Sequence, residues 1–462
     1  MPDFNVLLIS TYELGRQPFG LASPAAWLRE TGAEVRCLDL SVDLLNTEAV
    51  RAADLVAIHL PMHMGTRLAL PVIERVQQLN PRAHLCCFGL YAPVNAAYLH
   101  SLGVDSILGG EFETGLVQLA ERLAHSPNGK TPAGKFQPEP LISLDRQQFL
   151  VPDRSGLPDL SRYAHLITSD GRQLKVGYTE ASRGCKHLCR HCPIVPVYGG
   201  HFRVVQRGVV LADIRQQVEA GAQHITFGDP DFFNGPGHAI PIVTTLHQEF
   251  PDLTYDVTIK VEHLLKQAKY LPTLKETGCL FITTAVESFD EQILAIFDKG
   301  HTTQDFETAL ELCRQQDLLL VPTFVAFTPW TTLAGYQTFL AEVARLGLIE
   351  QVAPIQYTLR LLIPPGSRLL DFCEMDRVVE TLDEASLSYR WRNSDPRLEQ
   401  LQRDLELLVH QCAKQLLSRV ETFRQIWQRA QQGARDASGP IPSIEQPTNG
   451  RTGPHLTEPW YC

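Results

Sequence analysis

Three cysteines in one short loop constrain this chain more than any other feature. Cys185, Cys189 and Cys192 follow residues 175–180, which have the pattern of a β-strand, and Gly184 opens the turn before them. A loop of this length can direct three thiolates toward one point, and thiolates bind both iron–sulfur clusters and zinc. Because a complete set normally has four ligands, three cysteines predict a [4Fe–4S] cluster with one iron left open to a small molecule.

The spacing of these cysteines resembles the signature of the radical S-adenosylmethionine (SAM) superfamily. The resemblance implies that the open iron binds the amino and carboxylate groups of SAM. It also implies that the reduced cluster cleaves SAM to an organic radical, while the protein supplies orientation. A reductant such as flavodoxin or ferredoxin is then a partner. Family members usually have an aromatic residue before the third cysteine, where this chain has His191.

A zinc site is the alternative that the same residues leave open. In that interpretation His187 or His191 completes a site with the three cysteines, in a zinc-stabilised binding or scaffold protein without turnover. A structural zinc site more naturally takes its second pair of ligands from a distant part of the chain. The cluster is therefore the favoured interpretation.

Length and charge limit the number of domains and the kind of partner. A chain of 462 residues is too long for one ordinary core, so we expect two or three domains. The net charge is −11, with 41 Lys and Arg residues against 52 Asp and Glu residues. Such a surface does not attract a polyanion, so we expect no nucleic-acid partner and a small-molecule substrate.

No stretch of the sequence has the pattern of a signal peptide or a membrane span. The first residues lack a basic region, and residues 318–330, the longest apolar stretch, are interrupted by Pro322 and Pro329. A bilayer span needs roughly 20 apolar residues. We therefore expect a cytoplasmic protein with no membrane contact, in which the eleven cysteines stay reduced.

Strand and helix patterns alternate through residues 1–125, which predicts an α/β domain with a doubly wound parallel sheet. Five segments resemble the cobalamin-binding-type domain that precedes the catalytic domain in one branch of radical SAM enzymes: residues 27–35, 53–58, 80–81, 88–89 and 104–113. The loop at residues 10–15 lacks the histidine that such domains place on cobalt. His59 and His63 follow the third predicted strand. Cobalamin is thus possible but not favoured.

The rest of the chain divides by composition into four parts. Residues 126–173 are interrupted by prolines and are interpreted as a linker. Residues 174–367 alternate again and predict a (β/α)6-type partial barrel. Residues 368–431 predict a helical segment, with one helix running through Trp427. Residues 432–462, rich in Gly, Pro, Ser and Thr, predict a flexible tail.

Three polar residues follow predicted barrel strands, where the reacting groups of parallel barrels lie. The family resemblance implies that Asp229 contacts the amino group of SAM and that Glu287 contacts its ribose or carboxylate. Arg360, on the sixth predicted strand, can pair with a carboxylate of SAM or of the substrate. The alternatives are a turn-capping role for Asp229 and a structural ion pair for Arg360.

The sequence ends in two aromatic residues and a thiol, Trp460-Tyr461-Cys462. Together with residues 89–95, this ending resembles an uncharacterised radical SAM family named for a tail of Cys-Sec-Ala-Glu-Pro or Cys-Cys-Ala-Glu-Pro. A selenocysteine codon read as a stop would end the chain at this point. A more distant resemblance to a radical SAM enzyme of arsinothricin biosynthesis implies a thiophilic substrate, with Cys462 as a catalytic residue at the barrel mouth.

Overall fold

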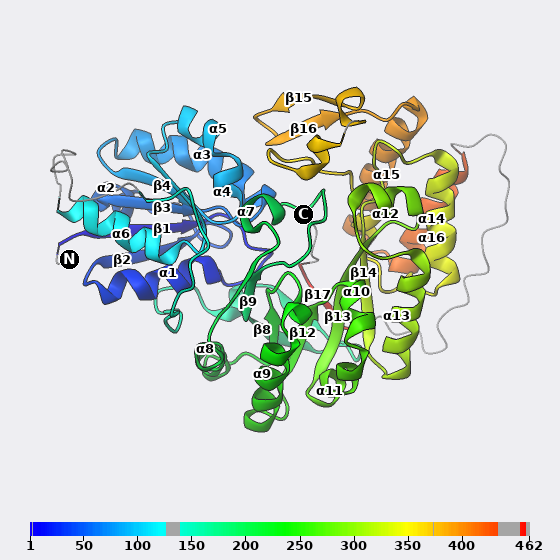
Figure 1. Cartoon of the computed structure of the whole chain (residues 1–462), viewed down its shortest axis with the longest axis horizontal. Coiled ribbons are helices and arrows are strands. Elements are labelled where there is room, and N and C mark those ends of the chain that lie inside the picture. The colour runs from blue at the N-terminus through cyan, green and yellow to red at the C-terminus, as the bar shows by residue number, and fades with distance from the viewer. Residues whose placement is uncertain (2, 126–138, 373, 433–452, 459–462) are drawn as a thin grey trace.

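The chain folds into two α/β units that lie side by side, with a hairpin and two long helices next to the second unit (Figure 1). The computed structural model describes residues 1, 3–125, 139–372, 374–432 and 453–458. Within these ranges every helix is too short or too polar to cross a bilayer. The predicted fold class is confirmed.

In the described residues the first unit is a six-stranded sheet of parallel strands in the order β2-β1-β3-β4-β5-β6. The strands are β1 (Asn5–Ser10), β2 (Glu34–Asp39), β3 (Leu55–His59), β4 (His84–Phe88), β5 (Ser106–Gly110) and β6 (Ile142–Ser143). The strand order reverses between β1 and β3, and open sheets of this kind bind ligands at such a switch point. β6 comes from the predicted linker.

Two layers of helices bury the faces of this sheet, because successive strand residues point to opposite sides. Leu7 and Ile9 pack on one layer, and Val6 and Leu8 pack on the other. The first layer consists of α2 (Thr47–Ala52), α3 (His63–Leu79), α4 (Tyr91–Val94) and α5 (Ala96–Ser101), and the second of α1 (Phe19–Glu30) and α6 (Glu113–Ala124). The short helices α2 and α4 are not predicted from the sequence.

The second unit is a curled half barrel in the order β14-β13-β12-β11-β8-β7-β17. Its strands are β7 (His165–Ile167), β8 (Gln173–Thr179), β11 (His224–Phe227), β12 (Thr254–Thr258), β13 (Cys279–Glu287), β14 (Leu319–Phe324) and β17 (His455–Leu456). Strands β8, β11, β12, β13 and β14 run parallel, whereas β7 is antiparallel to β8. Their carboxyl ends therefore meet at one edge.

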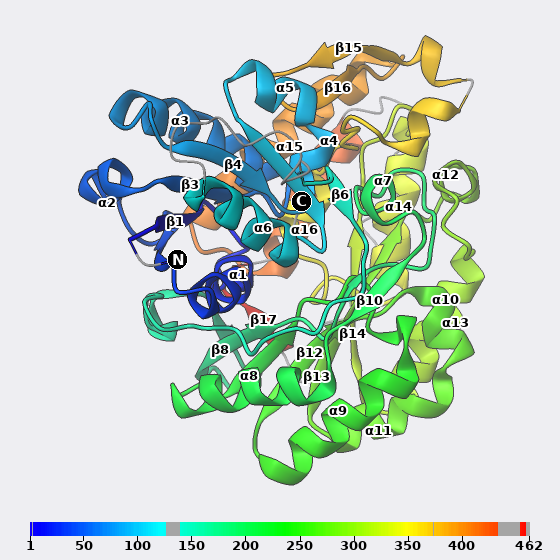
Figure 2. The same ribbon diagram turned by 60° about the vertical axis from the view of Figure 1, so that its left-hand side comes forward.

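Helices cover the outer face of the half barrel, and Figure 2 shows α8, α9 and α11 on this side. The helices are α8 (Arg207–Glu219), α9 (Pro236–Glu249), α10 (Val261–Lys266), α11 (Leu271–Glu276), α12 (Glu291–Phe297), α13 (Thr303–Gln315) and α14 (Leu333–Arg345). Strand residues such as Ile225, Val257 and Ile282 are fully buried in the shared core. The burial of these apolar side chains stabilises the half barrel, and the half barrel positions the loops at the carboxyl ends of its strands.

Residues 355–362, predicted as a sixth barrel strand, form a 3-10 turn instead, Pro354–Tyr357. The Oε1 atom of Gln356 accepts a hydrogen bond from the backbone N–H of Phe324 at 2.9 Å. The side chain thus satisfies a β14 donor that a sixth strand would have satisfied with its backbone. Pairing is reduced to one parallel bridge between Phe327 and Arg360.

The predicted single C-terminal helix is two helices, α15 (Pro396–Lys414) and α16 (Arg419–Gln432). Leu416 has a φ of +54° and is exposed, and the backbone N–H of Leu417 bonds to the carbonyl of Cys412. Ser418 then caps α16 by accepting from the N–H of Glu421. Apolar periodicity alone did not reveal this break, because both helices bury a similar stripe.

Two further pieces of the C-terminal region return to the first unit. The hairpin β15 (Val379–Asp383) and β16 (Ser388–Trp391) reaches α3, where Nε2 of His63 lies 2.6 Å from the carbonyl of Ser386. After β17, the carboxylate of Glu458 accepts a hydrogen bond from the hydroxyl of Tyr12 in the loop after β1. Residues 453–458 of the predicted flexible tail are therefore built into the fold.

Candidate active site

The cysteine loop begins directly after β8 and is closed at its base by two short strands. β9 (Ser182–Gly184) pairs antiparallel with β10 (Phe202–Val204). Gly184 has a φ of +75°, and a Cβ atom there would lie 2.4 Å from Cδ1 of Tyr198 and 2.5 Å from the carbonyl of His201. Only glycine fits this position, so the turn that opens the loop is fixed by the backbone.

The three cysteines of the loop are free thiols, with Cys189 buried and the other two half-buried. The pKa of Cys185 is raised to about 11 and that of Cys192 to about 12, mainly by burial and in smaller part by the neighbouring thiols. Bound iron displaces such protons, since thiolates are the metal-binding form. Three mutually interacting thiols on one loop fit a cluster with three cysteine ligands.

Glu287 lies beside this loop at the end of β13, in an unusual backbone conformation with a φ of +71°. Its Oε1 atom is 3.1 Å from both Nζ of Lys299 and Nε2 of His191. The Lys299 ammonium and the His191 imidazole hold the pKa of Glu287 well below its ordinary value, against its burial. Strained residues of this kind cluster at functional sites.

The ring of His191 stacks on Phe297, with centroids 4.4 Å apart and an interplanar angle of 27°. His191 therefore supplies a flat ring at the position where family members usually have an aromatic residue. His187 points elsewhere, toward Asp231 and Glu262. The two histidines considered as a fourth zinc ligand thus contact carboxylates: His191 contacts Glu287, and His187 contacts Asp231 and Glu262.

Asp229 lies in the loop after β11 and is almost fully buried. Its Oδ2 atom accepts from the N–H of Ala181 at 2.9 Å, and its Oδ1 atom accepts from the hydroxyl of Ser182 at 2.5 Å. These bonds hold the start of the cysteine loop. Burial raises the pKa of Asp229 to about 7. A contact between Asp229 and the amino group of SAM stays a prediction.

Asp229→Asn is expected to flatten the pH dependence of stability. The folded state keeps a proton on Asp229 that the unfolded state loses above about pH 4, so the free energy of unfolding falls as the pH rises toward about 7. The slope reaches about 1.4 kcal/mol per pH unit near pH 5.5. Asparagine can still accept from Ala181 and can donate to Ser182. Denaturant unfolding of both chains across this range measures the difference, and equal slopes would contradict the assignment.

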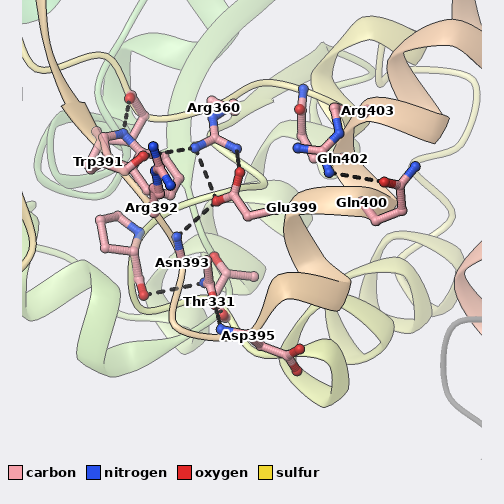
Figure 3. A network of polar contacts seen from close by, with 12 residues as sticks. Thr331, Arg360, Trp391, Arg392, Asn393, Asp395, Glu399, Gln400, Gln402 and Arg403 are labelled. Carbon is pink, nitrogen blue, oxygen red and sulfur yellow. Dashed lines mark hydrogen bonds and ion pairs between the residues drawn. The ribbon is translucent and has the colours of Figure 1, made fainter.

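Arg360 lies in a polar network between the half barrel and the C-terminal helices (Figure 3). Its guanidinium makes two bonds to Glu399, of 2.8 and 3.2 Å, and stacks 4.0 Å from the centre of the Trp391 ring. Asn393 continues the network to the carbonyl of Thr331. The structure thus shows the structural ion pair, and a contact of Arg360 with SAM or substrate stays a prediction. Cys462 lies outside the described residues.

Arg183, which the sequence analysis missed, connects the cysteine loop to the first unit. Its guanidinium makes bonds of 2.9 and 2.7 Å to the two carboxylate oxygens of Glu113 and lies 3.7 Å from Glu111. It also bonds Glu180 at 2.6 Å and lies 4.9 Å from the centre of the Phe112 ring. All of these side chains are buried or nearly so, and the pairing joins residues 70 positions apart.

The comparisons with known proteins agree with this geometry. Residues 179–327, from the end of β8 to Phe327, match the family model described as the Radical SAM superfamily. The cysteine loop and the half barrel thus lie within the segment that matches this superfamily, which agrees with the predicted [4Fe–4S] cluster and SAM as cofactors. The predicted class of enzyme is confirmed. The first α/β unit precedes this matched segment in the chain.

Two relatives resemble the chain over most of its length. The hopanoid C-3 methylase of Methylococcus capsulatus is 25% identical over 340 residues, which are 70% of this chain and 64% of the relative. The anaerobic magnesium-protoporphyrin IX monomethyl ester cyclase of Synechocystis sp. is 24% identical over 339 residues, 67% of this chain and 64% of the relative. The match therefore spans just under two thirds of the length of either protein.

Solved structures show the same fold at lower identity. The cobalamin-dependent SAM radical enzyme OxsB with aqua-cobalamin bound superposes with a TM-score of 0.65 at 15% identity, over 88% of this chain and 67% of that chain. The radical SAM methyltransferase TsrM from Kitasatospora setae, with tryptophan and a SAM analogue bound, gives 0.61 at 16% identity, over 83% and 82%. Both have the two-unit architecture in common with this chain.

Proposed function

We propose that this protein cleaves SAM reductively at a [4Fe–4S] cluster held by Cys185, Cys189 and Cys192, and modifies a small-molecule substrate by radical chemistry. The observation that carries the proposal is the presence of three free thiols on the one loop that follows β8, at the carboxyl edge of the half barrel. The match of this segment to the radical SAM superfamily supports it. The cluster would supply the electron that breaks a carbon–sulfur bond of SAM.

The chain's own residues would shape and orient the site. The stacked pair of His191 and Phe297 offers a flat surface beside the third cysteine. Glu287 stays ionised because Lys299 neutralises it, so its free lone pairs can accept hydrogen bonds from SAM hydroxyl or ammonium groups. Asp229 holds the start of the loop through Ala181 and Ser182. Positioning of this kind is the protein's main contribution in such enzymes.

Single-turnover product analysis tests the proposal and identifies the bond that breaks. The anaerobically reconstituted protein is mixed with SAM and a reductant, and the products are separated by chromatography. Formation of 5′-deoxyadenosine would indicate hydrogen abstraction, and 5′-methylthioadenosine would indicate transfer of an aminocarboxypropyl group. Absence of either product from protein with a full complement of iron and sulfide would contradict reductive cleavage.

We further propose that Cys462 acts at the barrel mouth on a thiophilic substrate, as the resemblance to the Cys-Sec-Ala-Glu-Pro and Cys-Cys-Ala-Glu-Pro tail family implies. β17 is antiparallel to β7, which is antiparallel to β8, so β17 runs in the same direction as the barrel strands. The chain therefore leaves β17 toward the edge that carries the cysteine loop. Four residue-to-residue steps lead from Glu458 to Cys462, and they span at most about 14 Å.

Deletion of residues 460–462 is expected to leave cluster assembly and SAM cleavage intact while product formation from the substrate falls at least about tenfold. The reason is that Glu458 and β17 keep their contacts with Tyr12 and β7. Iron content, SAM cleavage and substrate conversion are measured separately. Full conversion by the shortened chain would exclude a catalytic role for Cys462.

Cobalamin-dependent methyl transfer is a second candidate, and one feature of the first unit favours it. In the described part of the chain, Ser10 Oγ, Glu13 Oε2 and His59 Nδ1 are buried without a hydrogen-bond partner, and the His59 Nδ1 atom lies 3.5 Å from Oε1 of Glu13. They gather at the switch point between β1 and β3, and buried polar groups normally have partners. The aqua-cobalamin bound to OxsB agrees with a cobalamin site here, and the hopanoid methylase and the methyltransferase TsrM agree with methyl transfer.

The residues present fit cobalamin without a histidine on the cobalt. The ring of His59 is enclosed by Phe88 and Phe112, at centroid distances of 5.1 and 5.8 Å, and the space beside it is occupied by Gly20. It does not face outward as a metal ligand would. Purification from cells supplied with cobalamin decides the matter: a retained corrinoid spectrum supports this candidate, and its absence supports the sequence-based prediction of no tight cobalamin.

A further inference from the structure

Three side chains from separate segments meet next to the cysteine loop and form a donor set that the cluster does not use. They are His187, between Cys185 and Cys189; Asp231, in the loop after β11; and His263, on α10. One donor atom from each lies within 4.8 Å of the other two. Within the described ranges this is the one such group of three histidine, cysteine or acidic side chains.

The distances are those of a site that needs only small side-chain movements to close on an ion. Nδ1 of His263 lies 2.6 Å from Oδ2 of Asp231, and Nε2 of His187 lies 3.8 Å from the same oxygen. Ligand atoms about 2.0–2.1 Å from a tetrahedral zinc ion are roughly 3.3 Å apart. The first distance must lengthen by about 0.7 Å and the second must shorten by about 0.5 Å. The donor atoms of the two histidines, which lie within 4.8 Å of each other, must approach by at most about 1.5 Å.

Outer contacts hold two of the three donors in the orientation that a metal requires. Nδ1 of His187 lies 3.3 Å from Oε2 of Glu262, so a proton on Nδ1 leaves the lone pair of Nε2 directed at Asp231. That Nε2 atom is buried and has no hydrogen-bond partner among the described residues. Oδ1 of Asp231 accepts from the N–H of Phe233 at 3.1 Å, which leaves Oδ2 for an ion. Histidines that bind metals commonly have a carboxylate behind them in this way.

We propose that His187, Asp231 and His263 bind a divalent transition-metal ion of the zinc type, separate from the iron–sulfur cluster. Two imidazoles and one carboxylate form a set that binds zinc with a position left open for water or an exogenous donor. Asp231 is 1% exposed and is a buried acceptor that an ion would neutralise. Lys260 and Lys266 both contact Glu262, whose single negative charge offsets one of their two positive charges.

This site differs from the zinc site that the sequence left open, since it uses no cysteine. The proposed ion also takes no part in the cleavage of SAM, which the cluster would carry out. His187 is its one member in the cysteine loop, so an ion here would tie that loop to α10 and to the loop after β11. The open position would face the same edge of the half barrel as the cluster, where a substrate donor atom could bind.

Titration with Co²⁺ as a spectroscopic probe tests the proposal. The full-length chain with Cys185, Cys189 and Cys192 replaced by alanine is used, so that neither cluster iron nor its thiolates compete. We expect one Co²⁺ per chain with absorption bands of a nitrogen–oxygen site. His263→Ala and Asp231→Asn should each weaken binding at least about tenfold, and Glu262→Gln about tenfold. His410→Ala, at an exposed histidine of α15, is the matched control and should bind as the parent does.

Two results would overturn the proposal: no Co²⁺ bound by the triple-alanine chain, or equal binding by the His263→Ala and His410→Ala chains. Folding is checked by melting temperature. Asp231→Asn keeps the Oδ1 acceptor for Phe233, and His263→Gln replaces His263→Ala if alanine lowers the melting temperature. Because the titration involves neither SAM nor the cluster, failure of the proposed SAM chemistry would leave its result unchanged.

Discussion

Simultaneous replacement of Cys185, Cys189 and Cys192 by alanine is expected to abolish cluster assembly and SAM cleavage together. The three thiols are the proposed cluster ligands, and removal of all three leaves no thiolate on this loop to hold iron. After anaerobic reconstitution, iron, sulfide and visible absorption should fall to background, and no nucleoside product should form. The fold should persist, since the loop is closed independently by β9 and β10.

Cys37→Ala is the matched control for this experiment. Cys37 is a half-buried free thiol on β2 in the first unit, so its loss removes a cysteine without touching the loop. Its cluster content should equal that of the wild type. If the triple-alanine chain kept the visible absorption, the cluster assignment would be wrong. It would also be wrong if the wild type held a zinc ion that the triple-alanine chain lacks, with no iron and no SAM cleavage under reducing conditions.

Arg183→Met is expected to destabilise the protein by about 3–5 kcal/mol, because it removes one partner of a buried ion pair and leaves the carboxylate of Glu113 uncompensated. Cluster content should fall as well, since Arg183 lies two residues before Cys185. Denaturant unfolding and iron analysis measure the two effects. Adding Glu113→Gln to Arg183→Met should restore part of the stability, because the unpaired charge is then gone.

Arg215→Met is the control for this second prediction. Arg215 makes an equally close bidentate pair with Glu249, but both side chains are substantially exposed. Exposed pairs contribute about 0–1 kcal/mol, so the control should lie close to wild type. Similar losses for Arg183→Met and Arg215→Met would show that the buried pair has no special role in joining the two units.

Local sequence patterns predicted the cysteine loop, the parallel strands and the class of enzyme. A loop ligand set is carried by a few adjacent residues, and buried parallel strands are short apolar runs, so both can be recognised without knowing the fold. The Arg183–Glu113 pair could not be found in this way, because its partners lie 70 residues apart. The His187, Asp231 and His263 group likewise comes from three segments that only the sheet brings together.

The wrong predictions have a common physical origin in tertiary contacts. The prediction of a sixth strand was wrong because the side chain of Gln356, and not a strand backbone, accepts the hydrogen bond from Phe324 of β14. The prediction of a single C-terminal helix was wrong because Leu416 adopts a left-handed backbone conformation between α15 and α16, whose buried apolar residues have similar spacing. In both cases the local pattern suggested an element, and a tertiary contact or a single backbone conformation decided it.

The placement of β17 has a consequence for how the protein forms during synthesis. β7 takes its outer neighbour from a segment 292 residues later, so the first unit and all the parallel barrel strands leave the ribosome before this edge can pair. During that interval β7 is an open edge strand, the kind of surface that invites pairing with other chains. A chain that stops after Gln432 should therefore be cut by protease in the turn between β7 and β8, and should aggregate more readily than the full-length chain.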